Sequence, residues 1–196
     1  MPRAPRILAF AGSMRRDSFN KRLVRIAADA AGRAGADVTV IDLKDYPLPI
    51  FDEDLEQESG APEQAVRLKQ LLVEHDGFLI ASPEYNSSVT AVLKNAIDWA
   101  SRGAEGEPPL LAFRGKAAAL MSASPGALGG LRGLVHLRAI LGNIGVLVLP
   151  TQTAVPRAFE AFDDDGTLKD EKTRTNVEGL GSSLAELLQK FSAVSI

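Results

Sequence analysis

Short apolar runs alternate with longer amphipathic segments along most of the chain. Each apolar run is continuous, which predicts a strand that is buried on both faces. The predicted strands are Ile7–Ala11, Val38–Leu43, Gly77–Ala81, Ala117–Ser122 and Val146–Leu149. The amphipathic segments predict helices at Phe19–Ala34, Glu63–His75, Val89–Ser101, Leu131–Ile144 and Asp170 to about Phe191. This alternation predicts an α/β fold in which helices cover both sides of a parallel sheet.

The chain has no internal repeat and no boundary of a second domain, so we expect a single domain over residues 1–196. Lys44–Ala61 is too long for a plain connection and predicts a rim or a lid. Gly103–Pro109 predicts a surface loop. Asp163–Gly166 resembles part of a calcium loop, but the first and twelfth positions of that register cannot ligate a metal. It therefore predicts a solvated turn, with Asp170 capping the last helix.

Composition narrows the functional classes. The chain has 196 residues, of which 45% are hydrophobic and 24% charged, and its net charge is −3. The 22 basic residues are scattered, which argues against nucleic-acid binding. The absence of cysteine excludes disulfides, thiolate metal sites and thiol catalysis. No apolar run could span a membrane or serve as a signal peptide, so we expect no membrane partner and a cytoplasmic location.

A polar segment after the first predicted strand has the features of a phosphate-binding loop. Gly12 permits a tight turn, Ser13, Ser18 and Asn20 supply hydrogen-bond donors, and Arg15 supplies a cation. The helix that follows points free N–H groups at the same place. Neither the nucleoside-triphosphatase loop nor the dinucleotide fingerprint is present, so one terminal phosphate of a mononucleotide fits best. The alternative is an ordinary helix start capped by Ser18.

Two further loops follow the third and fourth predicted strands. The first offers an aromatic face and an amide, which suit a flat heteroaromatic ring, although a turn that caps a helix is the simpler alternative. The second is rich in glycine and permits close approach to its backbone, or is merely a loose turn. Loops that follow strands of one parallel sheet converge at one edge. The residues concerned are Pro83, Glu84, Tyr85, Asn86, Ser124, Gly126 and the pair Gly129-Gly130.

Together these motifs resemble the NADPH-dependent FMN reductase family, which includes bacterial chromate/quinone reductases and azoreductases. The likeness runs from Ile7 to about Pro150. It implies a flavodoxin-like three-layer sandwich whose five-stranded parallel sheet has the order 2-1-3-4-5. The matching motifs are Gly12-Ser13-x-Arg15-x-x-Ser18-x-Asn20, Pro83-Glu84-Tyr85-Asn86-x-Ser88, Leu93 to Trp99, Ser124-x-Gly126-x-x-Gly129-Gly130 and His136-Leu137-Arg138.

The resemblance also implies a cofactor, FMN, with NADPH or NADH as co-substrate and a quinone, azo compound, chromate or flavin as acceptor. Ping-pong kinetics, no catalytic acid or nucleophile and no metal are implied as well. The FMN phosphate would be held in the Gly12 loop by Ser13, Arg15, Ser18 and Asn20. The isoalloxazine would lie at Pro83, Glu84, Tyr85 and Asn86, with Ser124 and Gly126 on its far edge.

Other interpretations of the chain remain open. One is a flavodoxin-type electron carrier without nicotinamide oxidase activity, although such carriers are strongly acidic and a net charge of −3 is mild. Another is a flavin-free signalling or scaffold domain, and a third is a reductase of free flavin for a partner monooxygenase. The resemblance implies a homodimer, with a homotetramer as the alternative. Residues 131–135 lack the tyrosine that links subunits in some relatives, which argues against the tetramer.

Four single residues have structural explanations. His136 is interpreted as a packed or capping residue, or as part of a subunit contact. His75 lies at a helix end, where a cation is favourable. Trp99 continues an apolar helix face and belongs to the core or to an interface. Glu84 either binds substrate or points its side chain into solvent while its backbone touches the flavin.

Overall fold

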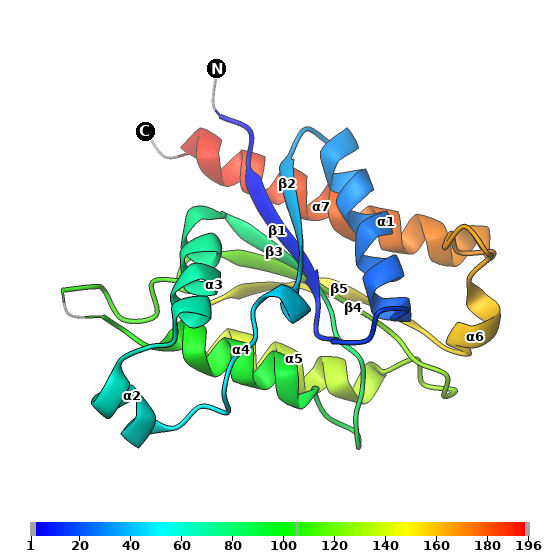
Figure 1. Cartoon of the computed structure of the whole chain (residues 1–196). Coiled ribbons are helices and arrows are strands. Elements are labelled where there is room, and N and C mark those ends of the chain that lie inside the picture. Colours follow the sequence, from blue (N-terminus) through cyan, green and yellow to red (C-terminus); the bar gives the residue numbers. More distant parts are fainter. Residues whose placement is uncertain (1–2, 105, 195–196) are drawn as a thin grey trace.

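The computed structural model describes residues 3–104 and 106–194. Its centre is a five-stranded parallel sheet in the order β2-β1-β3-β4-β5 (Figure 1). The order is the one that the resemblance implies, and the flavodoxin-like fold is confirmed. The strands are β1 (Arg6–Ala11), β2 (Asp37–Asp42), β3 (Gly77–Ala81), β4 (Ala117–Ala123) and β5 (Leu147–Val155).

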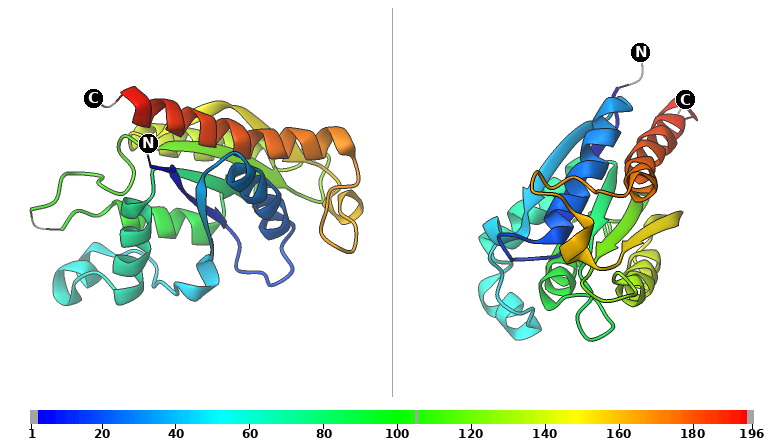
Figure 2. Two further views of the ribbon diagram at one scale, coloured as in Figure 1. Left: turned by 90° about the horizontal axis from the view of Figure 1, so that it is seen from above. Right: turned by 90° about the vertical axis from the view of Figure 1, so that its right-hand side faces the viewer.

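Helices cover both faces of this sheet (Figures 1 and 2). On one face lie α1 (Phe19–Arg33) and the long α7 (Glu171–Val194), which pack against each other. The other face carries α3 (Glu63–Glu74), α4 (Ala91–Ser101) and α5 (Leu131–Asn143). The sequence pattern did not predict the short helices η1 (Leu43–Asp45), α2 (Glu53–Ser59) and α6 (Ala158–Ala161).

The alternation of side chains along the strands divides the core into two layers. Ala9 of β1 faces the layer with α1 and α7, whereas Phe10 faces the layer with α3, α4 and α5. Small residues on the first side let the helices approach closely. A Cβ atom at Gly181 of α7 would lie 2.0 Å from the carbonyl oxygen of Ala27 in α1, so this crossing requires a glycine.

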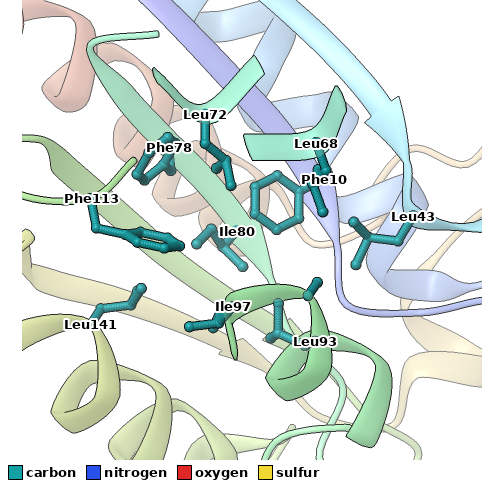
Figure 3. Close-up of a pocket in the computed structure, with 11 residues that line it drawn as sticks. Phe10, Leu43, Leu68, Leu72, Phe78, Ile80, Leu93, Ile97, Phe113 and Leu141 are labelled. Atoms are coloured by element: carbon teal, nitrogen blue, oxygen red, sulfur yellow. The ribbon is translucent and has the colours of Figure 1, made fainter. Parts of the chain in front are cut away.

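The second layer contains a small apolar cavity of about 10 Å³ between the sheet and its helices. Side chains from β1, β3, α3, α4 and α5 point toward one another around it (Figure 3). A space of this size without polar partners holds no ordered water. It is a gap in core packing and does not lie at the strand ends where a ligand is predicted. Its lining includes Phe10, Leu68, Phe78, Ile80, Leu93 and Leu141.

Two predictions about the strands need correction. The first and last strands along the sheet, β2 and β5, are not buried on both faces, and Val40 and Leu147 are exposed. Both strands lie at the sheet edges, where helices cover less of each face. The predicted last strand also ended too early. It continues past Pro150 because a register shift in the pairing of β4 with β5 accommodates a residue that cannot donate a hydrogen bond.

The segment Lys44–Ala61 is a fixed rim. The Asn95 side chain of α4 accepts a hydrogen bond from Phe51 N (2.8 Å) and donates one to Pro49 O (2.8 Å). The Trp99 indole donates to the same carbonyl oxygen at 2.8 Å and is itself buried, as expected for a core residue. These contacts hold the segment against α4, so the structure supports the rim and not the lid.

Candidate functional site

Three loops meet at the carboxyl edge of the sheet, as the sequence predicts. Backbone hydrogen bonds continue the sheet beyond its strands: Gly12 N donates to Ala81 O (2.9 Å) and Ser82 N donates to Met121 O (2.9 Å). Ser124 N donates to the last residue of β5 at 3.1 Å. The loops after β1, β3 and β4 therefore lie side by side and form one site.

Gly12 begins the first loop and packs against the start of α4. A Cβ atom at this position would lie 2.9 Å from Leu93, closer than real Cβ contacts. The Gly12 carbonyl oxygen also accepts a hydrogen bond from Thr90 Oγ1 at 2.7 Å, and the same hydroxyl accepts one from Leu93 N at 3.2 Å. Thr90 thus caps α4 and joins it to the first loop, and α4 begins two residues later than predicted.

Ser13 and Ser18 bring hydroxyl groups to the start of α1. Both residues are almost completely buried. Ser18 occupies the N-cap position, but its side chain forms no capping hydrogen bond, so an ordinary capped helix start does not describe this loop. The first N–H groups of a helix have no acceptors inside it. The start of α1 therefore offers amide and hydroxyl donors together, as a phosphate group requires.

Arg15 adds a positive charge to this loop. Its side chain is exposed and donates to Asp17 O at 3.3 Å, while its backbone N–H donates to Ser13 Oγ at 3.3 Å. No ion pair to Arg15 is present among residues 3–104 and 106–194. The guanidinium group is thus available to an anion at the surface of the loop.

Asn20 takes a different position from the other predicted ligands. Its amide lies in the interior, where Nδ2 donates to Ala123 O (2.8 Å) and Oδ1 accepts from Ala123 N (2.9 Å). These two bonds fasten the first turn of α1 to the end of β4. Asn20 therefore holds the first loop beside the third.

The second loop folds into a tight hairpin. Tyr85 and Ser88 exchange two backbone hydrogen bonds of 3.0 Å. Asn86 and Ser87 between them have φ angles of 49° and 67°, as in the two-residue type I′ turn, which asparagine tolerates well. Tyr85 remains 53% exposed at the turn, and Asn86 is exposed as well. The aromatic face and the amide are accessible to a ligand at this edge.

Glu84 neither faces solvent nor stands free to bind a substrate. Its side chain is 8% exposed and accepts hydrogen bonds from Arg132 N (3.0 Å), Gly133 N (3.2 Å) and Arg132 Nε (2.8 Å). Burial alone would raise the pKa of Glu84, but the bonds from Arg132 and Gly133 outweigh burial and lower the pKa. The carboxylate is therefore ionised and caps the N-terminus of α5.

The third loop approaches α5 and β5 closely. Gly126 N donates to Ser124 Oγ at 3.4 Å, and Gly126 O accepts from Gly129 N at 3.2 Å. Gly130 has a φ of 94°, and a Cβ atom there would lie 1.9 Å from Ser122 Oγ. The Ser122 hydroxyl is buried and has no hydrogen-bond partner within the described parts of the chain. Close packing therefore requires a glycine at position 130.

Comparisons with known proteins identify the family of the chain. The family model described as NADPH-dependent FMN reductase matches residues 5–160. The chain belongs to this family. It is 37% identical over 184 residues to an NADPH:quinone oxidoreductase of Arabidopsis thaliana, with 91% of this chain and 89% of the relative covered. It is 36% identical over 174 residues to an NAD(P)H-dependent FMN reductase of Pseudomonas aeruginosa, with 88% and 89% covered.

A solved structure agrees as well. The flavoenzyme NAD(P)H:(acceptor) oxidoreductase FerB from Paracoccus denitrificans superposes with a TM-score of 0.80 at 29% identity, over 95% of this chain and 98% of that one. Membership of the NADPH-dependent FMN reductase family confirms that the chain is an NAD(P)H-dependent oxidoreductase and that its cofactor is FMN.

The donor set at the first loop fits the cofactor of this family. A phosphate monoester carries a net negative charge and several acceptor oxygens, and the loop offers buried hydroxyls, a helix N-terminus and the exposed guanidinium group of Arg15. Within residues 3–104 and 106–194, no group of three or more histidine, cysteine or acidic residues could hold a metal ion. In that same part of the chain, no helix is long and apolar enough to cross a membrane.

The two histidines differ from each other in exposure. His136 of α5 is exposed and lies with Nδ1 2.9 Å from Ser88 Oγ, so the interpretation as a packed core residue is wrong. His75 is buried at the end of α3, with Nδ1 2.6 Å from Leu71 O, while its Nε2 has no hydrogen-bond partner among the described residues. Neither histidine lies on the first loop.

Sequence reasoning missed one residue at this edge of the sheet, Arg132, which holds Glu84. A signal was present, because a cation in the first turn of a helix opposes the helix dipole and therefore needs a nearby anion. Glu84, 48 residues earlier, is that anion. The spacing gives no indication of the pairing, since Glu84 lies in the second loop and Arg132 in the first turn of α5.

Proposed function

We propose that this reductase passes two electrons from NAD(P)H to a quinone by a ping-pong mechanism. The observation that carries the proposal is the uncapped start of α1, where Ser13 and Ser18 are buried beside free helix N–H groups. The names of relatives from potato and Arabidopsis thaliana, both NAD(P)H- or NADPH-dependent quinone oxidoreductases, support quinone as the acceptor class. Azo compounds, chromate and free flavin are the competing acceptors.

The residues divide into those that hold the phosphate and those that hold the ring. Ser13, Arg15 and Ser18 bind the FMN phosphate, and Asn20 positions them through Ala123. The ring lies along the second loop, between Pro83 and Asn86, with Ser124 and Gly126 at its far edge. When bound, FMN supplies the chemistry by accepting a hydride from the nicotinamide and returning two electrons to the acceptor.

The chain itself contributes positioning. No acidic side chain stands free at the second loop, residues 83–88, because Glu84 is tied to Arg132. The hairpin and the third loop would hold the ring, and donor and acceptor would then use the same place beside it in turn. Release of the oxidised nicotinamide before the acceptor binds would give a ping-pong mechanism.

We further propose a homodimer. Leu131 and Val135 of α5 are exposed apolar side chains, and His136 lies beside them on the same helix. Apolar residues grouped on one exposed helix face favour a contact between proteins. A homotetramer and a cytoplasmic location remain predictions from the sequence.

Steady-state kinetics tests the proposed function. We expect double-reciprocal plots of NAD(P)H oxidation at several benzoquinone concentrations to give parallel lines, and benzoquinone to have a higher kcat/KM than azo dye, chromate or free FMN. Intersecting lines would overturn the ping-pong order, and a preference for another acceptor would overturn the substrate class. A protein that is reduced by dithionite but not by NADPH or NADH would be an electron carrier.

A further inference from the structure

The second loop rests on the backbone of α5. A Cβ atom at Gly133 would lie 3.1 Å from Ser88 O and 3.4 Å from the Cα atom of Glu84. The absence of a side chain at Gly133 thus lets both ends of the hairpin 84–88 lie directly on the first turns of the helix. This arrangement couples the position of the hairpin to the position of α5.

Polar contacts fix both ends of this hairpin to α5. Glu84 is held by the backbone N–H groups of Arg132 and Gly133 and by the Arg132 guanidinium group. Ser88 Oγ lies 2.9 Å from Nδ1 of His136, one helical turn further on. Tyr85 and Asn86, the residues predicted to meet the ring, lie between these two anchors. The backbone of Tyr85 and Asn86 cannot shift without breaking the contacts of Glu84 or of Ser88 with α5.

The pair formed by Glu84 and Arg132 is electrically balanced but unequally buried. The Glu84 side chain is 8% exposed, whereas the Arg132 side chain is 57% exposed. Neither side chain forms a second ion pair with any described residue. Loss of either partner therefore leaves one uncompensated charge next to the loop that holds the ring.

We propose that Glu84 and Arg132 are positioning residues that seat the second loop on α5 and balance each other's charge, so that neither one shifts the reduction potential of FMN bound there. The inference rests on the proposed placement of the ring along residues 83–86. Reduced FMN carries more negative charge than oxidised FMN. A lone cation near the ring favours the reduced form and raises the potential, a lone anion lowers it, and the intact pair leaves it nearly unchanged.

The test is the midpoint potential of the FMN-loaded protein in three variants, measured by spectroelectrochemistry. Glu84→Gln leaves Arg132 unpaired and is expected to raise the potential, whereas Arg132→Gln leaves Glu84 unpaired and is expected to lower it. Each shift is expected to be about 30 mV. For a two-electron couple this corresponds to about a tenfold change in the ratio of the protein's affinities for reduced and oxidised FMN. The double variant is expected to return to the wild-type potential.

A purely structural role gives a different result. If the pair only held the loop, both single variants would move the potential in the same direction or not at all, and the double variant would not recover. Either outcome overturns the proposal. Arg132→Lys keeps the charge and loses the forked hydrogen bonds, so we expect a wild-type potential with weaker FMN binding. This variant serves if Arg132→Gln fails to fold, and a shifted potential in it would also overturn the proposal.

Titration of the FMN-free wild-type and Arg15→Ala proteins with FMN distinguishes a wrong placement of the cofactor from a wrong role of the ion pair. If Arg15→Ala leaves the affinity for FMN unchanged, the proposed placement of the cofactor is wrong. If Arg15→Ala weakens binding and the potentials of the Glu84 and Arg132 variants do not diverge, only the tuning role is wrong.

Discussion

The two edges of the central sheet use polar residues in opposite ways. At the amino edge, Asp76 accepts two hydrogen bonds from Arg3 (2.6 and 2.9 Å) and one from Arg6 N (2.8 Å). Lys116 Nζ donates to Val73 O at 2.8 Å and to a second carbonyl oxygen at the end of α3. These groups satisfy one another within the protein.

At the carboxyl edge, by contrast, donors remain available. Ser18 makes no capping bond and Arg15 forms no ion pair with any described residue. Other polar groups of this edge, such as Asn20 and Glu84, are fully engaged and hold the loops together. A sheet edge that binds a ligand therefore needs two kinds of polar residue. Some remain free to bond to the ligand, and others bond within the protein and hold the loops in place.

The largest effect on stability is expected from Gly130→Ala. The new Cβ atom would collide with Ser122 Oγ at 1.9 Å, in a backbone conformation with φ at 94°. Strain and overpacking together predict a loss of about 2–4 kcal/mol in the free energy of unfolding. Urea unfolding of the FMN-free protein measures it.

The matched control lies on the helix that Gly130 precedes. A Cβ atom added at Gly142 would have no neighbouring atom within 4 Å, and the backbone there has no positive φ. Gly142→Ala should therefore be neutral or stabilise by up to about 1 kcal/mol. Equal losses in the two variants would show that close packing at Gly130 is not what holds the carboxyl edge together.

A smaller effect is expected at the amino edge from Asp76→Asn. Burial would raise the pKa of Asp76, but hydrogen bonds from Arg3 and Arg6 N outweigh burial and lower the pKa below its ordinary value. The carboxylate therefore stabilises the fold above its unfolded pKa, and this contribution is lost as the pH falls through the lowered folded pKa. We expect the variant to lose about 1–2 kcal/mol at neutral pH.

Urea unfolding across the acid range checks the sign of this effect. The gap between wild type and Asp76→Asn should narrow as the pH falls from about 5 to about 2. Asp29→Asn, at an exposed position of α1, should change stability by less than about 0.5 kcal/mol at neutral pH. A gap at Asp76 that stays constant across this range would exclude ionisation as its cause.

The sequence could predict those features that depend on residues close to one another along the chain. The continuous apolar runs predicted all five strands, and the first loop could be interpreted as phosphate-binding because its donors lie within Gly12–Asn20. Local patterns carry such information, since side-chain period and turn residues act over a few positions. The strand order came from the resemblance to the family.

Contacts between distant residues could not be predicted in this way. Asn20 and Ala123 are 103 residues apart, and Glu84 and Arg132 are 48 apart, so only the folded sheet brings them together. Burial of β2 and β5 was overestimated because an apolar run does not reveal whether its strand lies at a sheet edge. Whether a polar side chain is available to a ligand or bonded within the protein depends on residues far away in the sequence.

The smallest effect on stability, and the sharpest difference between the edges, is expected from Arg15→Ala. Its side chain is exposed and bonds only to the nearby Asp17 O, so stability should change by less than about 0.5 kcal/mol. Loss of a charged hydrogen bond should still weaken FMN binding about 10- to 100-fold, with turnover of the FMN-saturated enzyme near normal. Fluorescence titration of FMN-free protein measures this affinity, with Arg25→Ala, an exposed arginine further along α1, as the control. Equal affinities in both variants would place the phosphate away from Arg15.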